Sequence, residues 1–194
     1  MQEIILASQS PRRKQLLEWA EIPFKVVVQS TDEAFSSEMP VAEIPIYIAT
    51  QKASAVIDHL KFQQEFDESQ VVLAADTIVV LDNEVINKPI DRAHAIDILT
   101  RLSGKTHRVI TGVVLMKNQL VQKFSVTTHV QFHALSQEQI TFYVDQYKPY
   151  DKAGAYAIQE WIGVVGIAAI NGDFYNVMGL PVSSVVQALN TINM

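Results

Sequence analysis

Apolar and polar positions follow two different periods along the chain, and the alternation predicts strands and helices interleaved from one end to the other. Apolar runs without helical spacing predict strands, which we place at Glu3–Ala7, Phe24–Gln29, Val71–Leu81, Arg108–Met116, Leu120–Phe132 and Ile162–Ile170. Apolar residues spaced three and four apart predict helices, which we place at Ser10–Ala20, Ile44–Leu60, Asp91–Leu102, Ser136–Gln146 and Pro181–Ile192.

Local sequence signals support several of these boundaries. Ser10 before Pro11 is typical of a helix N-cap followed by proline in the first turn. Ser136 and Gln139 have the spacing of a capping box. The short segment Lys117–Gln119 joins two long strand patterns and predicts a hairpin. Because the two strands of a hairpin are antiparallel, this argues against a purely parallel sheet. We therefore expect a mixed α/β domain with a curved sheet.

Composition narrows the class of protein. With 194 residues, 48% of them hydrophobic and 19% charged, the chain can bury a core, which excludes disorder and predicts one domain over residues 1–194 or two closely packed lobes. The absence of cysteine excludes a thiolate nucleophile and a Cys-ligated zinc site. A net charge of −6 argues against direct binding to nucleic acid. We expect a soluble cytoplasmic protein, because the pattern contains neither a targeting segment nor a tract apolar enough for a membrane.

Three basic residues begin the first predicted helix. Arg12, Arg13 and Lys14 lie at the positive end of the helix dipole, where each cation is unfavourable by about 0.3–1 kcal/mol. An anion bound there would reverse this effect, since guanidinium groups and free N–H groups together bind phosphate. The alternative is a solvated basic turn.

Asp76 interrupts the most strand-like run of the chain. An unpaired carboxylate in a core costs several kcal/mol, so Asp76 must pair with a cation, bind a metal or be neutral, unless the strand bulges and exposes it. Lys52 lies on the apolar side of its predicted helix, and taken alone its position fits an aliphatic stem that carries its charge to solvent. Lys88 follows the turn after the Asp76 strand and could reach the same region.

The segment Asp151–Tyr156 combines two opposite charges with small residues, so it is either an ordinary polar turn or a place where backbone approaches a ligand closely. Gln159, shortly after it, could read the edge of a base. No glycine-rich phosphate loop follows the first strand. His129 and His133 lie on a polar strand face, which is more typical of solvation than of a metal site.

The chain resembles the Maf family of nucleoside triphosphate pyrophosphatases in segments that run through nearly its whole length. The matching segments are Ile5–Arg13, which contains Ser8, then Ala49–Ala53, Ala75–Thr77, Lys88-Pro89, Leu102–His107, Asp151–Gln159 and Asn176–Pro181. Ala75 stands where the family more often has glycine, and Glu160-Trp161 stands where glycine and small residues are common.

The resemblance implies two α/β lobes around a curved mixed sheet with a deep nucleotide cleft between them. It implies hydrolysis of a nucleoside triphosphate between the α and β phosphates, with Mg²⁺ or Mn²⁺ as cofactor, and it is compatible with a homodimer. The form of the segment that ends at Gln159 is similar to the branch that prefers dTTP and UTP, although modified pyrimidine nucleotides stay open as substrates.

The resemblance implies that Asp76 is the catalytic carboxylate and that Arg12, Thr77 and Gln159 govern the choice of base. From the unusual residues described above we also expect Asp76 and Glu33 to hold the metal; whether Asp76 acts mainly as base or as ligand stays open. The remaining candidates bind the substrate or set its specificity: Ser8, Arg12, Arg13, Lys52, Thr77, Lys88 and Gln159. Two other functions stay open, a nucleotide-responsive regulator of cell division or septum formation and a pyrophosphatase for non-standard nucleotides such as ITP.

Overall fold

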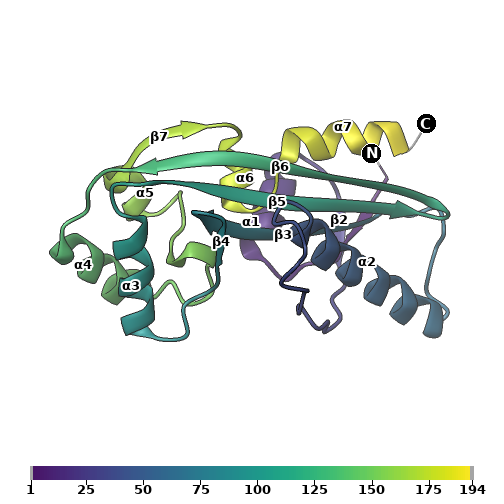
Figure 1. Ribbon diagram of the computed structural model, residues 1–194. Helices are drawn as coiled ribbons and strands as arrows, with labels where there is room; N and C mark the ends of the chain where they lie inside the picture. The colour runs from purple at the N-terminus through teal and green to yellow at the C-terminus, as the bar shows by residue number, and fades with distance from the viewer. Residues whose placement is uncertain (1, 193–194) are drawn as a thin grey trace. The chain divides into compact units, whose positions relative to one another are not determined.

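The computed structural model describes residues 2–192, in which strands and helices are interleaved as the sequence predicts (Figure 1). The strands are β1 Ile4–Leu6, β2 Phe24–Val26, β3 Val72–Leu81, β4 Glu84–Ile86, β5 Thr106–Lys117, β6 Leu120–Phe132 and β7 Ile167–Asn171. The helices are α1 Pro11–Trp19, α2 Ile44–Phe62, α3 Arg92–Leu102, α4 Gln137–Tyr147, α5 Trp161–Gly166, α6 Phe174–Met178 and α7 Val182–Ile192, with a 3₁₀ turn η1 at Ala153–Ala155.

The sheet is mixed, with the strand order β2-β1-β3-β5-β6-β7 and β4 paired to β3. Strand β1 runs parallel to both β2 and β3, and Leu6 lies opposite Leu73. The β3–β4 and β6–β7 pairs are antiparallel. The predicted mixed α/β class is therefore confirmed.

The chain divides into two compact units. The first contains residues 1–76, 111–126 and 179–194, and the second contains residues 77–110 and 127–178. Strands β3, β5 and β6 each contribute residues to both units, and the division in β3 falls between Asp76 and Thr77. The two units are described separately below.

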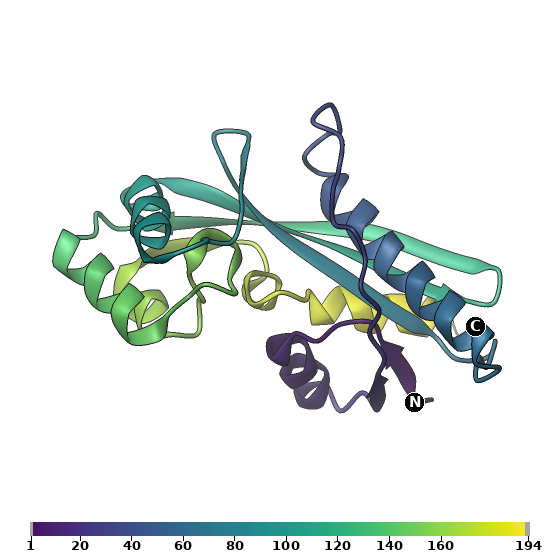
Figure 2. The same cartoon turned by 90° about the horizontal axis from the view of Figure 1, so that it is seen from below.

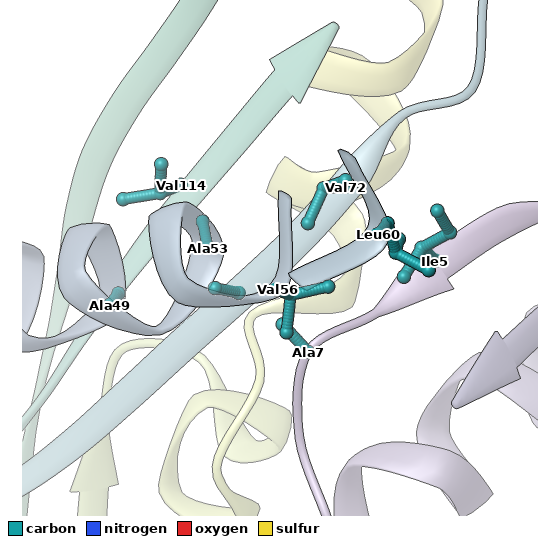
Figure 3. Close-up of a cluster of buried hydrophobic side chains, with 9 residues drawn as sticks. Ile5, Ala7, Ala49, Ala53, Val56, Leu60, Val72 and Val114 are labelled. Carbon is teal, nitrogen blue, oxygen red and sulfur yellow. The ribbon is translucent and has the colours of Figure 1, made fainter. Parts of the chain in front are cut away.

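The core of the first unit forms where α2 packs on the sheet. One side of α2 presents Ala49, Ala53, Val56 and Leu60, which pack with residues of β1, β3 and β5 (Figure 3). Gly112 of β5 permits close packing against the start of α2, because a Cβ at this position would lie 2.3 Å from the backbone nitrogen of Ile46. Small side chains therefore bring the helix close to the strands.

The second unit packs α3 beside α4 (Figure 2). Its core contains an aromatic cluster in which His107, Phe132 and Tyr156 contact one another, with ring centroids 5.1–5.4 Å apart. The Nε2 atom of His107 lies 2.7 Å from the hydroxyl of Tyr156, and the imidazole is 1% exposed. Burial lowers the pKa of His107 to about 4 and raises the pKa of Tyr156.

One segment that was predicted as a strand is partly helical in the structure. The expected strand Ile162–Ile170 is a helix up to Gly166 and becomes strand β7 only from Ile167. Ile162 and Gly166 are buried while Val164 is 81% exposed, so this run is not a continuous buried strand. A short apolar run does not distinguish helix from strand by periodicity, which explains the error.

The other boundaries agree closely with the sequence. Ser10 caps α1, Ser136 and Gln139 form the predicted capping box, and β5 and β6 form the predicted hairpin. Strand β4 and the short helix α6 were not predicted. Within residues 2–192, none of the helices is long and apolar enough to traverse a bilayer.

We expect His107 to make the folded chain less stable in mild acid. The unfolded imidazole takes up a proton near pH 6.5 but the folded one only near pH 4, so its contribution to stability is complete above pH 6.5 and is lost as the pH falls toward 4. Urea unfolding at pH 7.5 and pH 5.0 measures this loss. The variant His107→Phe should show a smaller loss, whereas His129→Gln, which changes an exposed imidazole, should keep the parent value. An unchanged loss in His107→Phe would contradict the assignment.

Candidate active site

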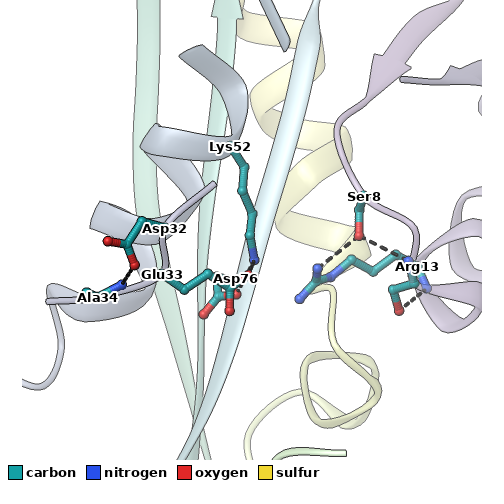
Figure 4. Close-up of polar contacts among 8 residues, drawn as sticks. Ser8, Arg13, Asp32, Glu33, Ala34, Lys52 and Asp76 are labelled. Carbon is teal, nitrogen blue, oxygen red and sulfur yellow. Dashed lines mark hydrogen bonds and ion pairs between the residues drawn. The ribbon is translucent and has the colours of Figure 1, made fainter. Parts of the chain in front are cut away.

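The turn between β1 and α1 is held by two serine hydroxyls. The Oγ of Ser10 accepts a hydrogen bond from the backbone N–H of Arg13 at 3.4 Å, which caps the helix. The Oγ of Ser8 accepts from the backbone N–H of Ser10 at 3.3 Å and from the Arg13 guanidinium at 3.0 Å (Figure 4). Ser8 is buried, so its hydroxyl fixes the Arg13 side chain from inside the fold.

Arg13 is a buried cation at the start of α1. Its Nε donates a hydrogen bond of 2.8 Å to the carbonyl of Gly179, and the residue is 9% exposed. Burial lowers the pKa of the guanidinium, and the negative charges of Asp76 and Glu33 act in the opposite direction. Arg12, on the same turn, lowers the pKa of Arg13 further, so the two guanidiniums interact electrostatically. The first turn of α1 therefore concentrates positive charge where the helix dipole is also positive.

Asp76, Glu33 and Lys52 form a partly buried ion cluster. The Nζ of Lys52 lies 2.7 Å from the Oδ1 of Asp76 and 2.7 Å from the Oε1 of Glu33 (Figure 4). The side chains of Asp76 and Lys52 are 13% and 18% exposed, and that of Glu33 is 50% exposed. Asp76 is thus paired, as its place in an apolar strand requires. Lys52 is not a lysine that carries its charge to solvent: its ammonium is bound by two carboxylates.

The cluster brings together two kinds of group that phosphate chemistry uses. Two carboxylate oxygens converge on one point, which Lys52 occupies, and a buried guanidinium lies within their electrostatic influence. Carboxylates of this kind can bind a divalent cation or accept a proton, and the arginines can neutralise an anion.

The second unit carries the remaining sequence candidates. Thr77 follows Asp76 in β3 and is partly buried, Lys88 is exposed after β4, and Gln159 is exposed between η1 and α5. The structure therefore groups Ser8, Arg12, Arg13, Glu33, Lys52 and Asp76 in the first unit, and it places Thr77, Lys88 and Gln159 in the second.

The segment before Gln159 is packed against the protein. Gly154 has φ +71°, and a Cβ there would lie 2.9 Å from the Val79 side chain. Its close approach is therefore to the core of its own unit rather than to a ligand. This accounts for the glycine without the ligand contact that the sequence left open.

Sequence reasoning missed several residues that shape these groups. The carbonyl of Gly179 orients Arg13 across 166 positions of sequence, a separation that no local pattern reveals. In the second unit the hydroxyl of Tyr143 donates to the Glu160 carboxylate, and Lys152 lies near the same carboxylate. A signal for Glu160 existed, because it departs from the small residues common at this position in the family that the chain resembles.

The fold and the site define an α/β protein with an acidic cluster beside arginines at a helix N-terminus. Residues 3–192 match the sequence profile of the family described as Maf-like protein, and the chain belongs to this family.

Curated relatives match nearly the whole chain. The "dTTP/UTP pyrophosphatase" of Cytophaga hutchinsonii is 47% identical over 96% of this chain and 83% of its own length. The proteins of the same name from Parabacteroides distasonis and Bacteroides thetaiotaomicron are 46% and 42% identical, over 96% and 98% of this chain and 94% and 96% of their own lengths.

Among solved structures, the Staphylococcus aureus Ham1 protein matches with a TM-score of 0.45 and 13% identity, over 68% of this chain and 72% of its own. This likeness is too low to bear on function.

Proposed function

We propose that the chain is a nucleoside triphosphate pyrophosphatase that hydrolyses dTTP and UTP to the monophosphate and pyrophosphate in the cytoplasm. The observation that carries this proposal is the paired carboxylate cluster of Asp76 and Glu33 beside the buried Arg13. The curated relatives named for this activity support the choice of reaction and of base.

In this proposal the first unit binds the phosphates. Arg12 and Arg13 neutralise phosphate oxygens, and the first turn of α1 offers backbone N–H groups to the same anion. Ser8 keeps the Arg13 guanidinium in place, since its hydroxyl accepts from that group at 3.0 Å. Lys88, which is exposed after β4, stays a sequence-based candidate for phosphate binding.

A divalent cation, Mg²⁺ or Mn²⁺, fits the donor set of the first unit. The carboxylates of Asp76 and Glu33 each have an oxygen 2.7 Å from the Nζ of Lys52, so the two groups face a common position. Mg²⁺ is commonly held by one or two carboxylates together with substrate phosphates. Within residues 2–192 there is no group of three or more His, Asp or Glu side chains arranged to hold a metal. The two carboxylates would therefore share the ion with the substrate. When bound, such an ion withdraws charge from phosphate oxygens and lowers the pKa of its water.

Asp76 is the proposed proton acceptor. A water oxygen forms a bond to the α phosphorus, one of the water protons passes to the Asp76 carboxylate, and the bond from the α phosphorus to the bridging oxygen breaks with pyrophosphate as leaving group. Before substrate and metal bind, Lys52 orients Asp76 through the 2.7 Å contact at Oδ1.

Gln159 is the proposed reader of the base. An amide offers both a donor and an acceptor, which matches the carbonyl and N–H pattern shared by thymine and uracil. Thr77 is proposed to assist in the same selection.

The variant Asp76→Asn should fold and lose turnover. The amide keeps the shape of the side chain but cannot take up the proton, so kcat should fall by about a hundredfold or more. The measurement is pyrophosphate release, scored separately from phosphate, over a panel of nucleoside triphosphates with Mg²⁺. The melting temperature of the variant serves as the control for folding. Turnover close to that of the parent would refute the role of Asp76, and absence of turnover in the parent with nucleotide binding retained would favour a nucleotide-responsive regulator.

The variant Gln159→Glu should lose its preference for dTTP and UTP. The carboxylate cannot donate to the base, and an unpaired polar group costs about 1–3 kcal/mol, so kcat/KM for both should fall about ten- to a hundredfold. Gln137→Glu, an exposed amide on α4, is the matched control and should leave kcat/KM unchanged. Equal kcat/KM in Gln159→Glu and the parent would place the selectivity elsewhere.

Lys52 should compete with a divalent cation for the two carboxylates when nucleotide is absent. The variant Lys52→Met leaves Asp76 and Glu33 without their ammonium partner, so its affinity for Mn²⁺ alone should rise about tenfold or more while turnover is lost. Titration of Mn²⁺ followed by electron paramagnetic resonance measures the affinity. Lys61→Met removes an exposed lysine of the same helix and should not change it. Equal Mn²⁺ affinity in Lys52→Met and the parent would show that the Lys52 ammonium and the divalent cation do not compete for the same carboxylates.

A further inference from the structure

Gln159 is an exposed side chain at the end of a closely packed segment. Residues 154–158 are buried, whereas Gln159 is exposed and Glu160 is partly so. The backbone N–H of Glu160 donates to the carbonyl of Ala157 at 3.1 Å, which makes a tight turn around Gln159. The turn restricts the backbone of Gln159 and so limits where its side-chain amide can lie.

The hydroxyl of Tyr143 contacts this turn on both sides of Gln159. It accepts a hydrogen bond of 3.1 Å from the backbone N–H of Ala157 and donates to the carboxylate of Glu160. Tyr143 is fully buried in α4, and its ring stacks on that of Tyr147 with centroids 4.9 Å apart. The hydroxyl of one buried tyrosine therefore links α4 to Ala157 and Glu160, which lie on either side of Gln159.

Glu160 is held by a cation as well. The Nζ of Lys152 lies 3.6 Å from the Oε1 of Glu160 and 2.8 Å from the Oδ1 of Asp151. Lys152 is 9% exposed, so the interaction takes place largely away from water, where it is weakly screened. The Glu160 carboxylate thus has one partner in α4 and one in the segment that precedes η1.

The residues after Glu160 reinforce the same turn. Trp161 contacts Phe142 of α4 with ring centroids 4.9 Å apart. A Cβ at Gly163 would lie 1.7 Å from the carbonyl oxygen of Ile158, so α5 is in direct backbone contact with the turn. Two adjacent aromatic residues of α4 therefore contact two adjacent residues that follow Gln159.

We propose that Tyr143 and Glu160 are positioning residues that set the base selectivity of this chain by fixing the Gln159 turn. The inference rests on the proposed role of Gln159. A preorganised amide discriminates between bases because a mismatched edge cannot be accommodated by moving the turn, whereas a loosened turn can adapt to other bases. The Tyr143 hydroxyl contacts only the turn in these hydrogen bonds and has no part in the proposed phosphate chemistry, so we expect selectivity and turnover to separate.

The test compares Tyr143→Phe with Tyr147→Phe. Both variants lose one hydroxyl from α4, but only Tyr143 contacts the turn through its hydroxyl. For Tyr143→Phe we expect the ratio of kcat/KM for dTTP over dCTP to fall about tenfold, through KM, with kcat for dTTP within about twofold of the parent. For Tyr147→Phe the ratio should not change. A lower melting temperature with an unchanged ratio in Tyr143→Phe would show a merely structural role and overturn the proposal.

Two further variants test the Glu160 carboxylate. Glu160→Gln keeps an oxygen that can accept from Tyr143 but removes the charge near Lys152, so the dTTP/dCTP ratio should fall by less than in Tyr143→Phe. Glu160→Ala removes the contacts with both Tyr143 and Lys152, so the ratio should fall by more than in Glu160→Gln. If Tyr143→Phe does not fold, these two variants decide, and equal ratios in both and the parent overturn the proposal.

The outcome is separable from that of the proposed function. A changed ratio in Gln159→Glu with an unchanged ratio in Tyr143→Phe keeps the function and rejects the positioning role. If the parent releases no pyrophosphate, calorimetric affinities for dTTP and dCTP replace kcat/KM in the same variants. A tenfold loss of the affinity ratio in Tyr143→Phe would then support the positioning role even though the proposed reaction fails.

Discussion

The first unit depends on one electrostatic constraint, the burial of the Asp76 carboxylate inside an apolar strand. Five buried residues precede Asp76 without interruption and the strand is buried again from Ile78, so the carboxylate must have a partner. That partner, Lys52, comes from the same helix whose alanines pack on β1, β3 and β5. The small side chains bring α2 close enough for the lysine to reach the carboxylate at 2.7 Å. The same packing of α2 on the sheet therefore both forms the core and places the Lys52 ammonium beside Asp76.

In the second unit, Gln159 is positioned through its backbone rather than through an ion pair of its side chain. Gln159 is exposed, and the protein restricts it through the backbone around it rather than through its side chain. The Tyr143 hydroxyl and the Glu160 carboxylate do this with hydrogen bonds that are largely shielded from solvent, where they are stronger than at the surface. Glycines at 154 and 163 permit the close approach of neighbouring backbone and side chains. The exposed side chain of Gln159 thus projects from a backbone that is held on both sides of it.

The sequence predicted the mixed α/β class, the capped first helix and the need of Asp76 for a partner, because each follows from local pattern or from the free energy of a buried charge. It did not identify that partner, since the position of Lys52 fits a solvated lysine equally well until the helix is docked on the sheet. It also assigned residues 162–166 to a strand, where only tertiary packing decides between helix and strand. The contact of Arg13 with the Gly179 carbonyl joins distant parts of the chain and leaves no local signal.

The Lys52 cluster also bears on which ligands the proposed enzyme can process. The Lys52 ammonium lies between two carboxylates that would otherwise repel each other, and it offsets part of the negative charge that an approaching phosphate meets. An anion of high charge can draw the ammonium toward itself, and the carboxylates are then left to a cation that arrives with the same anion. A triphosphate offers more negative oxygens for this exchange than a monophosphate does. The nucleoside monophosphate left after cleavage has fewer negative oxygens, so it competes less well with Asp76 and Glu33 for the lysine. The ion cluster would in this way favour binding of the triphosphate over retention of the monophosphate.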